Sequence, residues 1–396
     1  MTDDSTNATR QFAQANWSRR RFLGGGAALS GGLMLGPTLL AGCGGDSKTT
    51  ASGADQNSGG KTLRISNWPL YMAEGFNAKF EKETGYKVSY KENFQDNEVW
   101  FAANKDALAA NQDIGADLVI PTNFMTARLI NLGWLTKLDH AAIPNMANVR
   151  PELIDGAWDP GAVYSMPYFS GFVGMAYNKA ETGRKITSVD DLWDPKFKGR
   201  VSMFSDMQDG LGMILKSQGI DLTDVTLDQV QAAADLVAEK NQGGQIRRFT
   251  GNDFQDDLTS GNVIVAQVYS GDVAQLQEDN PDIEFLVPEG GCSMFVDTMV
   301  APITTHNLKG AEAWMNFVYD RDNYASLTDF VQYIPVLTDM DDALAKVNPK
   351  LVDNPLVNPS PEMLAKAQEW GPRKEGAPAA TMKASAEVTG ARGAEG

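Results

Sequence analysis

The chain has 396 residues, of which 42% are hydrophobic, and this is enough for two domains with substantial cores. Its 51 acidic residues outnumber its 34 basic residues and give a formal net charge of −17. This balance argues against nucleic acid as a partner, because phosphate contacts need patches of Lys and Arg, and it is compatible with a cationic ligand.

The N-terminal segment has the pattern of an export signal. Arg19, Arg20 and Arg21 precede an uncharged stretch over residues 22–42, as in a secretory signal peptide. The string SRRRFL (18–23) resembles the twin-arginine export motif, and LAGC (40–43) resembles a bacterial lipobox. A retained transmembrane helix is the alternative, which the glycines and Pro37 of this stretch disfavour.

We therefore expect residues 1–42 to be a twin-arginine-type lipoprotein signal peptide. Cys43 would carry the lipid, and the exported protein would be anchored to the outer face of the cytoplasmic membrane, in a periplasm or at a cell surface. Residues 43–60 are rich in Gly, Ser and Asp and are expected to be a flexible tether.

Cysteine and histidine are scarce. With Cys43 lipidated, Cys292 has no partner, so we expect no disulfide framework. His140 and His306 lie far apart and have no metal-ligand spacing, so we expect neither a metal nor another cofactor.

A regular alternation of strands and helices begins at Lys61. Strands are expected at 62–68, 87–93 and 116–121, and helices at 73–85, 96–111 and 123–133. This alternation predicts a parallel sheet in an α/β domain. Ligands bind beyond the carboxyl ends of such strands, which places residues 67–71 and 121–124 on one rim.

A second α/β alternation follows a long extended segment at 163–178. Strands are expected at 199–204, 262–272 and 283–291, with helices after Ser205 and over 226–240. A second extended segment at 294–304 leads to helices at 308–320 and 323–333. This pattern therefore predicts two α/β lobes joined by two crossing segments. Lobe 1 is expected over 61–167 and 300–373, lobe 2 over 168–299, and a disordered tail over 374–396.

Several segments resemble, in the same order, the spermidine/putrescine-binding proteins of bacterial ABC importers. The similarity covers roughly residues 61–372. The order of the segments is more specific to this family than any single segment is. The segments are LRISNWPLYMAEGFNAKFEKETGYKVSY, ADLVIPTNF, YSMPYFSGFVGMAYN, TSVDDLWDPKFKGRVSMFSDMQDGLGM, VYSGD, EGGCSMFVDTMVAP and QYIPV.

The resemblance implies a type II periplasmic-binding-protein fold that closes on a polyamine in the cleft between its lobes. It implies delivery of the ligand to a membrane permease by a protein that is expected to be a monomer and not an enzyme. The positions that match the ligand contacts of the family are Trp68, Tyr71, Thr122, Phe124, Asp206, Asp209, Tyr269, Phe295, Asp297 and Tyr333.

The chemistry of these residues suits a polyamine. Aromatic faces attract ammonium groups and contact methylenes, and carboxylates offset the desolvation of the buried cation. Tyr269 and Phe295 stand where the family commonly has tryptophan, and Glu369-Trp370 lacks the glutamine that usually follows. Three matched acids would suit a triamine, whereas a diamine needs two, so the choice between spermidine and putrescine stays open.

Each residue also has a purely structural interpretation. Asp206 and Asp209 would favour the positive end of a helix, and Ser205 with Gln208 would form a capping box there. Trp68 and Tyr71 are residue types that are often buried. Asp297 is harder to explain structurally, because an acid in an extended apolar run needs a buried partner or a ligand.

Two other functions remain as alternatives. The same fold could bind another organic cation, an oligopeptide or ferric ion, although no adjacent tyrosine pair of the kind typical of iron sites occurs. A secreted hydrolase could use Asp206 and Asp209 as acid and base, but their separation of three residues is awkward for that geometry.

Overall fold

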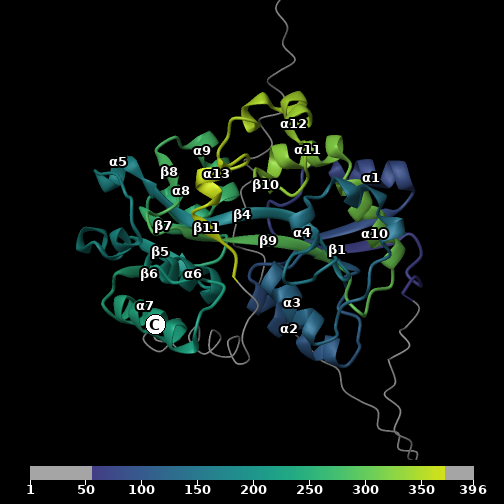
Figure 1. Ribbon diagram of the computed structural model, residues 1–396, viewed down its shortest axis with the longest axis horizontal. Coiled ribbons are helices and arrows are strands. Elements are labelled where there is room, and N and C mark those ends of the chain that lie inside the picture. The colour runs from purple at the N-terminus through teal and green to yellow at the C-terminus, as the bar shows by residue number, and fades with distance from the viewer. Residues whose placement is uncertain (1–55, 371–396) are drawn as a thin grey trace, which may run out of the picture. The chain divides into compact units, whose positions relative to one another are not determined.

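Residues 56–370 are the part of the chain that the computed structural model describes (Figure 1). The predicted signal peptide, Cys43 and the predicted tail from residue 374 lie outside this range and stay predictions. The last residues of the predicted tether, 56–60, form a turn. Its Gly59 N–H donates to the carbonyl oxygen of His306 at 2.7 Å, so this turn is bonded to the folded chain.

An eleven-stranded mixed sheet runs through the described residues. Its main path has the order β2-β1-β3-β9-β4-β7-β5-β6, while β8 and β10 pair with β4 and β11 pairs with β9. The strands are β1 (Thr62–Asn67), β2 (Lys87–Glu92), β3 (Leu118–Val119), β4 (Ser165–Asn178), β5 (Val201–Phe204), β6 (Ile246–Thr250), β7 (Val265–Tyr269), β8 (Ile283–Leu286), β9 (Cys292–Val300), β10 (Ile334–Pro335) and β11 (Ala367–Gln368).

The longer helices of the first half follow the predicted alternation, whereas two four-residue helices were not predicted. The helices are α1 (Phe76–Thr84), α2 (Asn97–Ala109), α3 (Asn123–Asn131), α4 (Pro151–Ile154), α5 (Lys179–Thr182) and α6 (Met207–Ser217), with 3₁₀ turns η1 (His140–Ala142), η2 (Pro144–Asn148), η3 (Val189–Trp193) and η4 (Pro195–Phe197). Helix α1 ends at Thr84, and Gly85, the predicted end, caps it, because this glycine adopts the left-handed conformation (φ 74°) in which its N–H reaches the carbonyl of Glu81.

The helices of the second half include three that were not predicted, at 254–260, 270–279 and 341–347. The elements are α7 (Leu227–Gln242), α8 (Phe254–Ser260), α9 (Ser270–Asp279), α10 (Leu308–Val318), α11 (Arg321–Val331), α12 (Asp341–Val347), η5 (Pro349–Leu351) and α13 (Pro361–Leu364). No helix within residues 56–370 is both long enough and apolar enough to cross a membrane.

Two parallel strand sets are joined by two crossing strands, as predicted. Strand β1 is parallel to β2 and β3, and β5 is parallel to β6 and β7. Strands β4 and β9 are antiparallel to each other along most of their length, and β4 then pairs with β7 (Figure 1). The predicted lobe boundaries fall inside β4 and at the last residue of β9, and they stay predictions.

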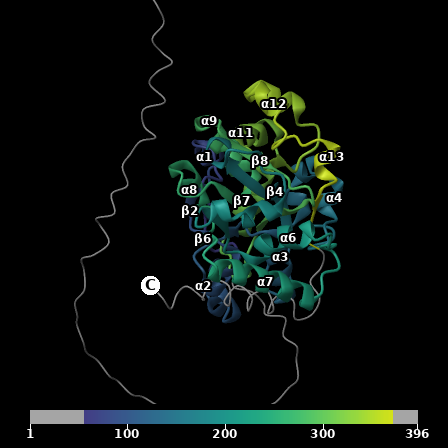
Figure 2. The ribbon, with the colours of Figure 1, turned by 90° about the vertical axis from the view of Figure 1, so that its left-hand side faces the viewer.

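Helices from both strand sets pack on the crossing strands. Helices α3 and α6 contact β9, while α9 contacts β4 and β7. Figure 2 shows the side of the sheet that carries β6 and β7, together with α6 and α7. Helix α6 buries Leu211, Ile214 and Leu215, whose spacing of three and four residues gives one apolar face. This packing fixes the N-terminal end of α6 beside the crossing strands.

Candidate functional site

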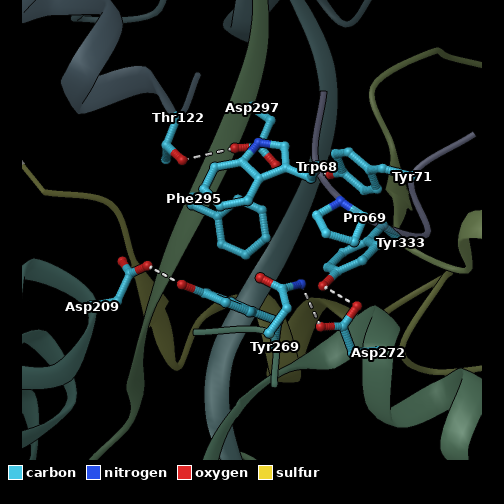
Figure 3. Close-up of a pocket in the computed structure, with 11 residues that line it drawn as sticks. Trp68, Pro69, Tyr71, Thr122, Asp209, Tyr269, Asp272, Phe295, Asp297 and Tyr333 are labelled. Carbon is cyan, nitrogen blue, oxygen red and sulfur yellow. Dashed lines mark hydrogen bonds between the residues drawn. The ribbon is translucent and has the colours of Figure 1, made fainter. Parts of the chain in front are cut away.

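A pocket lies where the carboxyl ends of the two parallel strand sets meet the crossing strands. Its volume is about 350 Å³, including space open to solvent. Figure 3 shows its side chains pointing toward one another from separate elements. The pocket is lined by Trp68, Pro69, Tyr71, Thr122, Asp209, Asn252, Tyr269, Asp272, Phe295, Asp297 and Tyr333.

Each carboxylate of the pocket accepts a hydrogen bond from a tyrosine hydroxyl. None of the residues that line the pocket is Lys, Arg or His, so Asp272 and Asp297 have only neutral donors among the lining residues. The pairs are Tyr71 with Asp297 Oδ2 at 2.9 Å, Tyr269 with Asp209 Oδ2 at 2.9 Å, and Tyr333 with Asp272 Oδ1 at 3.0 Å. Burial raises the pKa of all three tyrosines well above their ordinary value, so the hydroxyls stay protonated and donate.

Asp297 lies on β9 and is 5% exposed. Thr122 Oγ1, at the start of α3, donates to its Oδ1 at 2.9 Å (Figure 3). Burial raises the pKa of Asp297 to about 7, even though the hydrogen bonds from Thr122 and Tyr71 lower it. Near neutral pH this carboxyl group is therefore balanced between its protonated and ionised forms.

Thr122 is itself held by a buried amide. Asn97, the first residue of α2, donates from Nδ2 to Thr122 Oγ1 at 3.0 Å and accepts from the Thr122 N–H at 3.2 Å. Because Thr122 Oγ1 accepts from Asn97, its one proton is directed to Asp297.

Asp272 is in the first turn of α9, immediately after β7, and is 3% exposed. Asn252 Nδ2 donates to its Oδ2 at 3.0 Å, while Tyr333 donates to its other oxygen. Burial raises the pKa of Asp272 to about 7, an effect reduced by hydrogen bonds from Tyr333, Gln255 and Asn252.

The start of α6 differs from the predicted capping box. Asp206, not Ser205, is the N-cap residue, and its Oδ1 accepts from the Gln208 N–H at 3.0 Å. Ser205 Oγ instead lies 3.3 Å from Asp96 Oδ2 and from the Thr250 carbonyl oxygen. The cap is one residue later because Ser205 still belongs to the end of the sheet, where its N–H bonds to Thr250.

Gln267 joins the strand and the helix that flank this cap. Its Oε1 accepts from the Phe204 N–H at 3.0 Å and its Nε2 donates to the Gly210 carbonyl at 2.9 Å. Gln267 is fully buried on β7, so both bonds form in an apolar environment. It thereby fixes the first turn of α6, which carries Asp209.

Aromatic rings form the walls of the pocket. Trp68 packs against Phe94 with ring centroids 4.4 Å apart and donates from Nε1 to the Ile120 carbonyl at 2.7 Å. Phe295 meets Tyr269 and Tyr333 edge to face, at centroid distances of 5.5 and 5.9 Å. Such rings can contact the methylenes of a ligand and attract its cationic groups.

Two glycines make room for the ring of Tyr333. A Cβ at Gly271 would lie 2.2 Å from Tyr333 Cδ2, and a Cβ at Gly171 would lie 2.8 Å from Tyr333 Cδ1. Any larger residue would collide with the ring, so glycine at both positions permits its position beside Asp272.

The structure brings most of the predicted site residues together. All except Phe124 and Asp206 line the pocket. Phe124 is half-buried against the main hydrophobic core at the start of α3, and Asp206 is buried at the N-cap of α6. Which of these residues bind ligand stays a prediction.

Sequence reasoning missed Pro69, Asn252 and Asp272, although signals for them existed. Asp272 belongs to the VYSGD segment, from which only Tyr269 was selected. Asn252 lies two residues after the end of β6, much as Trp68 follows β1, but β6 was not predicted.

The described residues offer no candidate metal centre. No group of three or more His, Cys, Asp or Glu side chains in residues 56–370 is arranged to hold an ion. Cys292 is a free buried thiol, and burial raises its pKa to about 12.

Comparisons with known proteins agree with this architecture. The chain is 26% identical to the spermidine/putrescine-binding periplasmic protein 1 of Haemophilus influenzae, over 82% of this chain and 86% of that protein. It is 30% identical to the putrescine/cadaverine-binding protein of Pseudomonas aeruginosa, over 71% of this chain and 81% of that protein. A structure described as a putative spermidine/putrescine ABC transporter from Listeria monocytogenes superposes with a TM-score of 0.74 and 26% identity, covering 83% of this chain and 99% of that one.

The predicted fold class is confirmed by the solved structures that this chain resembles, the Listeria protein among them. They are two-lobed periplasmic binding proteins. The family match extends over residues 76–359, and its members are solute-binding transport proteins and not enzymes. The chain therefore belongs to the family of bacterial extracellular solute-binding proteins.

Proposed function

We propose that this protein is the binding component of an ABC importer for polyamines such as spermidine and putrescine. The observation that carries the proposal is the pairing of the buried Asp272 and Asp297 with neutral donors, in a pocket lining that contains no Lys, Arg or His. Buried carboxylates without a cationic partner are costly. A polycation would supply the missing charge.

The donors and acceptors of the pocket support the same conclusion. Its side-chain donors are already used: the tyrosine, Thr122 and Asn252 groups bond to carboxylates, and the Trp68 indole bonds to a carbonyl. Carboxylate oxygens, by contrast, can each accept further hydrogen bonds. A ligand for this pocket must therefore bring donors, and the aromatic walls suit the methylenes between them.

The names of the relatives point to the same ligand class, since those proteins are described as binding spermidine, putrescine or cadaverine. The pocket residues come from both parallel strand sets and from both crossing strands or their neighbours. Closure of two lobes around a polyamine would favour one conformation of the protein, and a permease in the membrane would recognise it.

Anchoring to the membrane belongs to the same proposal. The lipobox-like sequence at residues 40–43 supports lipidation of Cys43 after export, and the protein would act as a monomer held at the outer face of the cytoplasmic membrane. Metabolic labelling with an alkyne fatty acid should label the wild-type chain and not Cys43→Ser. Equal labelling of both would overturn lipidation at this cysteine.

Calorimetry tests the ligand. The purified protein should release or absorb heat with putrescine, spermidine, spermine or cadaverine, and none with 4-aminobutyrate, in which a carboxylate replaces one ammonium group. Absence of binding to all four polyamines would contradict the proposed function. Consumption of the ligand during the titration would instead indicate an enzyme.

A further inference from the structure

One acceptor at the Asp272 end of the pocket has no protein partner. Asn252 Oδ1 is buried and accepts no hydrogen bond from the described residues, although Asn252 lines the pocket. Buried polar atoms are nearly always satisfied, so an unpaired one at a candidate site indicates a partner that arrives with the ligand.

The orientation of this amide follows from its neighbour. Its Nδ2 lies 3.0 Å from Asp272 Oδ2, and only the NH₂ group, as a donor, can face a carboxylate oxygen. The Oδ1 atom, on the opposite branch of the planar amide, therefore faces away from Asp272. The other donors of the lining are already used on carboxylates or carbonyls, so none is left for Oδ1.

The loop that carries Asn252 is fixed by its neighbours. Asn252 follows β6, and Arg248 of this strand forms ion pairs with Asp253 and Asp257. Asp253 Oδ1 also accepts from the Gly251 N–H at 2.9 Å. The acceptor is thus held in place before any ligand arrives, which lowers the entropy cost of using it.

Building on the polyamine function proposed above, we infer that Asn252 Oδ1 and Asp272 together bind a primary ammonium group at one end of the ligand. Asp272 supplies the negative charge and one acceptor, and Asn252 supplies a second acceptor in a different direction. A primary ammonium has three N–H donors and can satisfy both. A tertiary ammonium has the same charge and a single N–H, so it can satisfy only one. Asn252 is therefore a specificity-determining residue that selects primary amines at this end.

Calorimetry with putrescine at pH 8.5, where Asp272 is ionised, tests this inference on the full chain. Asn252→Leu removes the unpaired acceptor and also one donor to Asp272. Tyr333→Phe is the matched control, since it removes the other neutral donor to Asp272 and keeps the aromatic ring. We expect Asn252→Leu to weaken putrescine binding about tenfold more than Tyr333→Phe does, the range of a hydrogen bond to a charged group.

N,N,N′,N′-Tetramethylputrescine provides a second readout. The preference of the wild type for putrescine over this ligand should fall in Asn252→Leu and persist in Tyr333→Phe. Asn252→Ser serves the same comparison if the leucine variant does not fold. If neither Asn252 variant loses more putrescine affinity than Tyr333→Phe does, the role of Asn252 is overturned. The proposed function would still stand. Failure of the wild type to bind any polyamine would overturn the proposed function and this inference together.

Discussion

The hydroxyl of Tyr71 donates a 2.9 Å hydrogen bond to Asp297, a residue 226 positions further along the chain. Tyr71 follows the first strand of one parallel set, and Asp297 lies on a crossing strand. The bond joins two elements of the pocket and gives the buried carboxylate a neutral donor. The first prediction concerns this carboxylate.

Asp297→Ala should weaken polyamine binding by more than tenfold, because the ligand loses one of its buried counter-charges. The measurement is calorimetry at pH 8. Asp190→Asn, which removes a similar charge from an exposed position, should bind within about twofold of wild type if long-range electrostatics are screened. Unchanged affinity in Asp297→Ala would refute the assigned site.

Polyamine affinity should rise as the pH increases from 5.5 to 8.5. Burial holds the pKa of both Asp272 and Asp297 at about 7, so below pH 7 protons compete with the cation for these groups. The ligand ammonium groups, with pKa values of about 10 as in lysine, keep their charge over this range. Each group that must ionise should cost up to about tenfold in affinity per pH unit below 7. A flat profile from titrations across this range would contradict the participation of both carboxylates.

Asp297→Asn should stabilise the ligand-free protein at high pH. The pKa of Asp297 is raised in the folded state, so folding favours its protonated form, and its contribution to stability is lost as the pH rises through about 7. The neutral amide avoids this loss. We expect the gain in the free energy of unfolding to be larger at pH 8.5 than at pH 5 by on the order of 2 kcal/mol, because the cost of ionisation grows as the pH rises from the unfolded pKa near 4 to the folded pKa of about 7. Urea denaturation at the two pH values measures the difference, and a gain of equal size at both would show that ionisation is not its cause.

Gly271→Ala should impair both folding and binding. Alanine normally stabilises a helix relative to glycine, but here its Cβ would lie 2.2 Å from the Tyr333 ring. We expect a loss of about 1–3 kcal/mol in the free energy of unfolding and weaker polyamine binding, because Tyr333 must move away from Asp272. In a double-mutant cycle, Tyr333→Ala should remove most of the stability cost of Gly271→Ala. Additive losses would mean that this contact is not the cause.

Gln267→Met should lower the free energy of unfolding by about 1–3 kcal/mol, because the Phe204 N–H and the Gly210 carbonyl lose a buried partner. Thermal or urea denaturation measures this loss. Polyamine affinity should also fall, since Gln267 fixes the turn that carries Asp209. Gln231, a half-buried amide on α7 that does not line the pocket, offers the control substitution Gln231→Met, which should leave affinity unchanged.

The sequence predicted the part of the site that follows recognisable strands. Trp68 and Thr122 come directly after apolar strands, so their common rim followed from the rule for parallel sheets. Asn252 was missed because β6 contains Arg247 and Arg248 and lies at the sheet edge, where no apolar run marks the strand. The sequence does not distinguish the roles of Asp206 and Asp209. The structure shows that Asp206 caps α6, whereas Asp209, in the first turn of that helix, lines the pocket.

The elements of the fold also differed in how well the sequence predicted them. Long periodic segments such as α10 and β4 were predicted within a few residues, whereas helices α8, α9 and α12 were not. Helix α9 begins at the residue after β7, without a loop, and its first residues were therefore taken as part of the preceding strand. The contact of Tyr333 with Gly271 depends on residues 62 positions apart, which local patterns do not relate.

The tyrosine–aspartate pairs have a consequence for proton exchange with the solvent. Near neutral pH Asp272 and Asp297 are each protonated in part of the ligand-free molecules, and a cation that pairs with these groups must displace those protons. Ligand binding is thereby an exchange of ammonium charge for protons. A triammonium ligand that engages both groups should release more protons than a monoammonium ligand that engages one. Titrations in buffers of different ionisation enthalpy would count the released protons, and so would count the charges that the pocket has accepted.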